Sequence, residues 1–131
     1  MKIIQDFPPN IADIASVLDV RGLRAVFTYG DELYNPTGGD ISEDLMAHEE
    51  THARQQAAIG KDQWWAMYLT DEKFRLKQEA EAYQAQYSFA RNNYNRDLRR
   101  RLLAELARGL SSKMYGNIIN KQQAKEIIEN G

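Results

Sequence analysis

The sequence contains no cysteine and only two histidines. The lack of cysteine excludes disulfide frameworks, thiolate metal sites and cysteine nucleophiles. Uncharged apolar runs are short throughout the chain, which argues against a transmembrane span. The net charge of −2 gives no general attraction to nucleic acid or to an anionic membrane. The sequence therefore predicts neither a nucleic-acid partner nor membrane insertion.

The composition is that of an ordinary globular protein, with 43% hydrophobic and 27% charged residues. A length of 131 residues leaves no room for two independent cores, so we expect a single domain over residues 1–131. Asp6 interrupts an already short apolar stretch at the N-terminus, which is unlike a secretory signal. We therefore expect a cytoplasmic protein.

Apolar periodicity and turn residues predict a mostly α (α+β) fold, a helix bundle with a small N-terminal β-hairpin. The hairpin is expected over residues 24–36, with Gly30 and Asp31 at its turn. A first helix should precede it and end at Gly22. Asp40 or Ser42 should cap the second helix. The later helices are expected at about residues 42–59, 62–69, 72–94, 95–110 and 120–131.

His48-Glu49-Glu50-Thr51-His52 is an HExxH motif inside the predicted helix 42–59. At about 100° per residue, the two histidines lie about 40° apart around the helix and one turn apart along it. Neutral imidazole suits zinc, and Glu49 lies near enough to the same face to reach a zinc-bound water. Glu50 points away from that face. The simpler alternative is a charged helix whose two histidines bind nothing.

Two histidines do not complete a catalytic zinc site, which usually has three protein ligands and one open position. Because no other histidine and no cysteine exist, the third ligand must be a carboxylate or, as a second choice, a tyrosine oxygen. The helix after residue 70 offers Glu72, Glu79 and Glu81. Glu79 borders the apolar stripe that this helix should bury, whereas Glu81 faces away and Glu72 lies two turns earlier. The stripe consists of Leu76, Ala80, Tyr83, Tyr87, Ala90 and Tyr94.

Glu79 is therefore the expected third ligand, and the alternative is a solvated helix glutamate. The expectation requires the helix with His48 and His52 to lie across the stripe. Zinc would then supply the partner that a partly buried carboxylate needs.

His48-Glu49-x-x-His52 followed by Glu79-Ala80-Glu81-Ala82-Tyr83 resembles the gluzincin class of zinc metallopeptidases, in which a glutamate on a later helix joins the two histidines. Roughly residues 25–90 are also similar to small, often phage-encoded proteins with a minimal zincin-like fold. The resemblance implies one zinc ion per chain, held by His48, His52 and Glu79. It further implies that Glu49 is the general base that cleaves a peptide or protein substrate, in the host cytoplasm or in a virion.

The sequence departs from thermolysin-like gluzincins in the residues around the metal. Tyr83 stands where those enzymes have an acidic residue that supports a histidine, and no histidine remains to stabilise the oxyanion. An arginine or a tyrosine, such as Tyr34, Tyr83 or Tyr87, would have to replace it. The chain also lacks a large C-terminal domain to form the far wall of a cleft.

Two other functions therefore stay open. One is a non-catalytic zinc-binding protein with a virion, assembly or interaction role. The other is a zinc hydrolase that acts on another bond, such as a cell-wall amide.

Three further features have a plain structural explanation beside a functional one. Trp64, Trp65 and Tyr68 are expected to pack in the core, although they could line a substrate pocket. The hairpin could bind an extended peptide along a sheet edge or could simply cover the helices. The arginines between residues 91 and 108 are expected to form a solvated helix face, with contact to phosphate or an acidic partner as the alternative.

Overall fold

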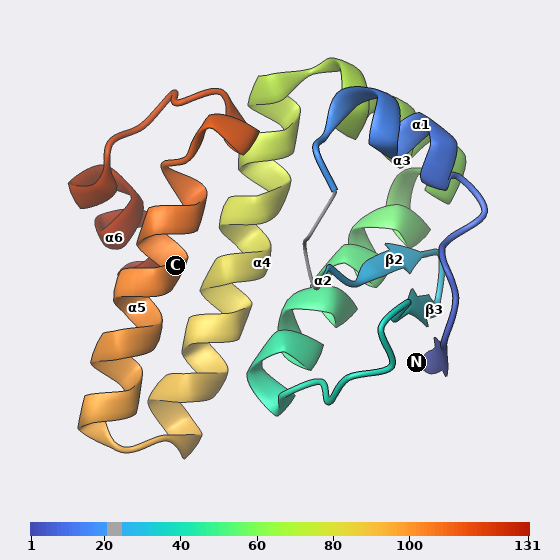
Figure 1. The fold of residues 1–131 in the computed structure, drawn as a ribbon. Helices are drawn as coiled ribbons and strands as arrows, with labels where there is room; N and C mark the ends of the chain where they lie inside the picture. The colour runs from blue at the N-terminus through green and yellow to red at the C-terminus, as the bar shows by residue number, and fades with distance from the viewer. Residues whose placement is uncertain (21–24) are drawn as a thin grey trace.

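The computed structural model describes residues 1–20 and 25–131. These residues form a mostly helical fold with a small sheet near the N-terminus, which confirms the expected fold class (Figure 1). The strands are β1 (Lys2–Ile4), β2 (Phe27–Tyr29) and β3 (Glu32–Tyr34). The helices are α1 (Ile11–Val17), α2 (Glu43–Ile59), α3 (Lys61–Thr70), α4 (Glu72–Asn93), α5 (Arg96–Leu110) and α6 (Lys121–Glu129), with the 3-10 helix η1 (Lys113–Tyr115) before α6.

The hairpin is shorter than expected and is part of a three-stranded sheet in the order β1-β3-β2. β2 and β3 pair antiparallel, and Gly30 takes the positive φ of 68° that their tight turn requires. β1 pairs parallel with β3 and was not predicted, because three residues are too few to show a strand period. Gly22, the expected end of the first helix, lies outside the described residues.

The starts of α2, α4, α5 and α6 follow from side chains that accept hydrogen bonds from free main-chain N–H groups. Ser42, and not Asp40, caps α2, while Asp71 caps α4 and Asn95 caps α5. Asn120 begins α6 with a complete capping box. Among the described residues, no helix is both long and apolar enough to cross a membrane.

The apolar core of the described residues has two clusters. The first cluster joins α1, the sheet and α3, and its buried members are Ile14, Phe27, Tyr34, Trp64, Trp65 and Tyr68. The second joins α5, η1 and α6, and its buried members are Leu103, Leu106, Ala107, Leu110, Tyr115, Ala124 and Ile128. α4 connects them, because Phe74 packs on the first cluster and Leu76 on the second.

α4 buries two faces, where the sequence predicted one. The apolar stripe from Leu76 to Tyr87 packs mainly against the second cluster. Glu79 and Gln86, on the neighbouring face, are also buried and contact α2. The expectation that α2 lies across the apolar stripe is met only in part, because Tyr83 and Tyr94 of the stripe contact His48 and Asp44 of α2. α4 is central in the bundle, with α2 on one side and α5 on the other, so both faces are covered (Figure 1).

Candidate metal centre

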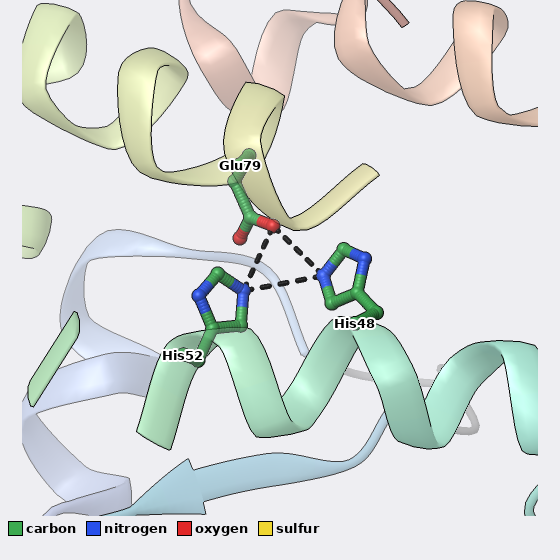
Figure 2. A group of neighbouring side chains, drawn as sticks. All are labelled: His48, His52 and Glu79. Atoms are coloured by element: carbon green, nitrogen blue, oxygen red, sulfur yellow. Dashed lines mark hydrogen bonds and ion pairs between the residues drawn. The ribbon is translucent and has the colours of Figure 1, made fainter. Parts of the chain in front are cut away.

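Two helices bring the expected metal-ligating side chains together. α2 carries His48 and His52 one turn apart, and Glu79 on α4 faces both rings (Figure 2). The Nε2 atoms of the two histidines lie 3.2 Å apart, and each lies 3.0 Å from Oε1 of Glu79. Glu72 and Glu81 are exposed and lie outside this cluster. Of the three glutamates considered, the structure therefore places Glu79 at the site.

Gln86 fixes the tautomer of His48. Its amide oxygen lies 2.9 Å from Nδ1 of His48, and its amide nitrogen donates a 2.8 Å hydrogen bond to the Asp44 carboxylate. Burial alone raises the pKa of Asp44, but hydrogen bonds from Gln86 and Tyr94 hold it below the usual value. Because an ionised carboxylate only accepts, the amide oxygen of Gln86 must face the ring. Nδ1 of His48 then carries the proton, and Nε2 presents a lone pair to the centre of the cluster.

Gln55 fixes His52 in the same way. Its amide oxygen lies 2.8 Å from Nδ1 of His52, and its amide nitrogen donates a 3.0 Å hydrogen bond to the main-chain carbonyl of Gln78. A carbonyl also only accepts, so the orientation of this amide is fixed as well. Both Nε2 atoms thus point to one place, as in metal sites where each histidine donates its other N–H to an oxygen.

Glu79 divides its two carboxylate oxygens between Tyr68 and the histidines. The Tyr68 hydroxyl donates a 2.5 Å hydrogen bond to Oε2, which leaves Oε1 for the two rings. Burial alone raises the pKa of Glu79, but the neighbouring His52 and His48 side chains hold it well below its usual range. Burial alone likewise lowers the pKa of His52, but the Glu79 carboxylate raises it to about 9. In the absence of a metal ion, protonated His52 therefore pairs with ionised Glu79.

The centre of the cluster needs a cation. Two imidazole nitrogens and a carboxylate oxygen converge there, on side chains that are only 6% to 8% exposed. Such buried acceptors repel one another unless a proton or a metal ion lies between them. The ligand atoms of a tetrahedral zinc ion lie about 3.3 Å apart, given bonds of about 2.0–2.1 Å, which is close to the spacing here. His48, His52 and Glu79 could therefore hold a metal ion.

Glu49 lies beside the cluster and is held there by β2. Its side chain is buried, and Oε2 accepts a 2.7 Å hydrogen bond from the hydroxyl of Thr28. Glu50, the next residue of α2, is exposed. The two adjacent glutamates thus point to different sides of α2, as the helical period of about 100° per residue predicts.

The main chain of Thr28 limits peptide binding along the β2 edge of the sheet, which the sequence analysis considered. β2 lies at the edge of the sheet. The Thr28 carbonyl already accepts two hydrogen bonds, of 2.8 Å from Gln56 and 3.0 Å from the Trp65 indole. This acceptor is therefore not free to pair with an added peptide strand.

A cavity of about 350 Å³ lies next to the cluster and is lined by all four residues of the predicted site, His48, Glu49, His52 and Glu79. One side of its lining comes from α1, β2 and α3. Another part of the lining comes from α4, α5 and η1. Trp64, Trp65 and Tyr68 belong to the first apolar cluster, as expected, and also line this cavity.

One of the three tyrosines considered for the oxyanion is at the cavity. Tyr83 lines it, and its ring packs edge-on against His48 with the centroids 4.8 Å apart. Burial raises the pKa of Tyr83, so its hydroxyl keeps its proton. Tyr34 and Tyr87 are not part of the lining. Tyr115, which the sequence did not single out, also lines the cavity, and its hydroxyl lies 3.5 Å from that of Tyr83.

The sequence interpretation missed most residues that support the site. Asp44 and Gln86 carry a helical signal, since Asp44 precedes His48 by four residues and Gln86 follows Glu79 by seven. Thr28 carries no such signal, because only the packing of β2 on α2 brings it to Glu49.

Comparison with known proteins identifies no relative: no family model, no curated protein and no solved structure matches this chain. A functional proposal therefore depends on the geometry and chemistry of the site.

Proposed function

We propose that this chain is a zinc-dependent hydrolase of peptide bonds, with zinc bound by His48, His52 and Glu79 and with Glu49 as the general base. The observation that carries the proposal is the orientation of the two imidazoles. Glutamine amides direct both Nε2 atoms at one carboxylate oxygen, beside a cavity that Glu49 also lines. The proposed substrate is a peptide or protein.

The donor set supports zinc as the metal. Two imidazole nitrogens and one glutamate oxygen are a ligand set of catalytic zinc sites, which keep a fourth position for water or substrate. Magnesium and calcium prefer sites built entirely from oxygen ligands and fit this cluster less well. The neighbouring cavity offers room for the fourth ligand.

Zinc, when bound, supplies a water of lowered pKa and polarises a carbonyl oxygen. Thr28 holds Glu49 so that its carboxylate can accept a proton from water in the cavity. The water oxygen bonds to the substrate carbonyl carbon, and Glu49 returns the proton to the amine as the carbon–nitrogen bond breaks. Tyr83 is the hydroxyl donor that we propose for the developing oxyanion.

One observation favours a second function, a metal site that only stabilises the fold. All three ligands are buried, and they join α2 to α4 between the two apolar clusters. Such a site would suit a non-catalytic virion, assembly or interaction protein. Structural zinc is usually closed by four protein ligands, however, and the cluster in the described part of the chain has three. Hydrolysis is therefore the function that we put first.

A peptide-mixture assay separates these functions. Zinc-loaded wild-type protein is incubated with a digest of unrelated proteins, and new peptide ends are identified by mass spectrometry. We expect new ends that disappear when a chelator removes the zinc and return when zinc is restored. Protein that retains zinc but produces no new ends would contradict peptide hydrolysis and favour the structural site. The same protein assayed on cell-wall fragments tests the remaining hydrolase alternative.

A further inference from the structure

We infer that Tyr68 is a positioning residue of the metal centre, which restricts Glu79 to one ligating oxygen and thereby keeps the bound ion four-coordinate. The inference rests on the proposed function, because it concerns the zinc ion of the same site. It deepens that function by naming the residue that sets the coordination number of the ion. The observations that carry it are the contacts of the second oxygen of Glu79 and the way in which α3 is fixed to α4.

The number of ligands around the ion depends on how Glu79 binds it. A carboxylate can ligate a metal ion through one oxygen or through both. Oε1 of Glu79 lies 3.0 Å from Nε2 of each histidine, at the place where the ligand atoms converge. Oε2 accepts the 2.5 Å hydrogen bond from the Tyr68 hydroxyl. This hydrogen bond holds the carboxylate in the orientation in which Oε1 faces the imidazoles, so that the fourth position of a tetrahedral ion is left to water or substrate.

The hydroxyl of Tyr68 is a rigid donor, because its ring is packed on two sides. The ring is buried and stacks on Trp64, with the ring centroids 4.8 Å apart. Trp65 packs edge-on against the same ring, at a centroid distance of 5.2 Å. The ring therefore cannot turn its hydroxyl towards another acceptor without disturbing the first apolar cluster.

Arg75 fixes the main chain of Tyr68 to α4. This arginine is buried, and its Nε donates a 2.8 Å hydrogen bond to the main-chain carbonyl of Tyr68. It also donates a 3.3 Å hydrogen bond to the Leu69 carbonyl, near the end of α3. Arg75 precedes Glu79 by four residues, about one turn, and so lies on the same side of α4. Tyr68 is thus bound to α4 twice, through its carbonyl and through its hydroxyl.

Cobalt(II) in place of zinc reports the coordination number. Its visible absorption is intense in four-coordinate sites and weak in five- or six-coordinate sites. We would load wild type and Tyr68→Phe, which keeps the buried ring and removes the hydroxyl, with cobalt in the absence of substrate. We expect intense bands in wild type and bands several times weaker in Tyr68→Phe, because both oxygens of Glu79 are then free to ligate. Zinc should bind Tyr68→Phe about 10–100-fold more weakly, as expected when a residue that orients a ligand is lost.

Tyr115→Phe is the matched control. Tyr115 is buried to a similar degree and lines the same cavity, but its hydroxyl lies 3.5 Å from that of Tyr83, whereas the hydroxyl of Tyr68 bonds a ligand. This variant should keep the wild-type cobalt spectrum and zinc affinity. A Tyr68 hydroxyl that only satisfied a buried carboxylate would change the stability of the protein but not the spectrum. An unchanged spectrum in Tyr68→Phe, or an equal change in the two variants, would therefore overturn the inference.

The wild-type spectrum decides the matter if Tyr68→Phe does not fold. Intense four-coordinate bands in wild type would support the inference, and weak bands of a five- or six-coordinate ion would overturn it. Wild-type protein that binds neither cobalt nor zinc would contradict the metal centre itself, and the role of Tyr68 with it.

The inference and the proposed function fail in different ways, because the spectra are recorded without substrate. A four-coordinate spectrum that depends on Tyr68, in a protein that cleaves no peptide, would contradict hydrolysis alone. Peptide cleavage by a protein whose cobalt spectrum is the same in wild type and in Tyr68→Phe would contradict the role of Tyr68 alone.

Discussion

The side-chain amide oxygen of Gln86 lies 2.9 Å from Nδ1 of His48. The amide nitrogen of Gln86 donates a hydrogen bond to the Asp44 carboxylate, so this carboxylate orients the imidazole of His48 through the glutamine. In thermolysin-like gluzincins, which the sequence resembles, an acidic residue four positions after the glutamate ligand supports a histidine, and Tyr83 stands at that position here. In this structure a carboxylate supports His48 from elsewhere, because Asp44 on α2 acts through Gln86 on α4.

We expect Gln86→Ala to weaken zinc binding about 10–100-fold, because the ring of His48 loses the partner that fixes its tautomer. Competition with a chromogenic chelator measures the affinity. Gln84→Ala is the matched control, since Gln84 is on the same helix and donates to the Ile127 carbonyl, away from the metal centre. Equal losses in the two variants would show that the effect of Gln86 is merely structural.

Glu79→Ala should abolish tight zinc binding, whereas Glu81→Ala should leave it unchanged. Glu79 supplies one of the three converging ligand atoms, and Glu81 is exposed on another face of α4. Because a bound metal stabilises the folded state, zinc should raise the thermal midpoint of wild type and of Glu81→Ala but not of Glu79→Ala. A similar zinc-induced shift in all three proteins would exclude Glu79 as a ligand.

Glu49→Gln should retain zinc and lose about 10²–10⁴ in the rate of peptide hydrolysis, as expected when a positioned general base is removed. Glu50→Gln, an exposed neighbour on the same helix, should keep both the metal and the rate. Metal analysis and the peptide assay are made on the same preparations. Loss of zinc from Glu49→Gln, or a rate like that of wild type, would refute the assigned role.

Zinc affinity should rise with pH. In the metal-free protein the Glu79 carboxylate raises the pKa of His52 from its ordinary value of 6.5 to about 9, so a proton occupies the ring at pH 7 and must leave when zinc binds. The affinity should therefore increase up to about pH 9 and then level off. Calorimetry at pH 7 in two buffers of different ionisation enthalpy should detect about one proton released per zinc. An affinity independent of pH, with no proton release, would disagree with this pairing.

The stability of the metal-free protein should change in the opposite direction. A raised pKa in the folded state stabilises the protein fully below pH 6.5, and this contribution is lost as the pH rises through about 9. The free energy of unfolding of the metal-free wild type should thus fall over this range, as urea titrations would show. His52→Ala, which lacks the group, should show a smaller fall, and a fall of equal size would point to other residues.

Local sequence signals predicted the parts of the fold that depend on neighbouring residues. Cap residues such as Asn95 and Asn120 mark helix starts because they bond to N–H groups only two or three positions away. The one-turn spacing of His48 and His52 likewise follows from the helix alone. These features needed no knowledge of tertiary contacts.

The missed features depend on contacts between distant segments. β1 is defined by pairing with β3, and Thr28 meets Glu49 only when the sheet packs on α2. The sequence suggested one buried face for α4, because the apolar stripe is visible as a pattern. The face with Glu79 and Gln86 is polar, and its burial against α2 depends on hydrogen bonds that the sequence pattern does not reveal.

Metal analysis of protein purified without chelators tests the metal centre most directly. We expect about one zinc per chain in wild type, with little or none in His48→Ala and His52→Ala prepared in parallel. Wild-type protein that carries no zinc and takes up none on reconstitution, while remaining folded, would contradict the metal centre and the hydrolytic function that depends on it.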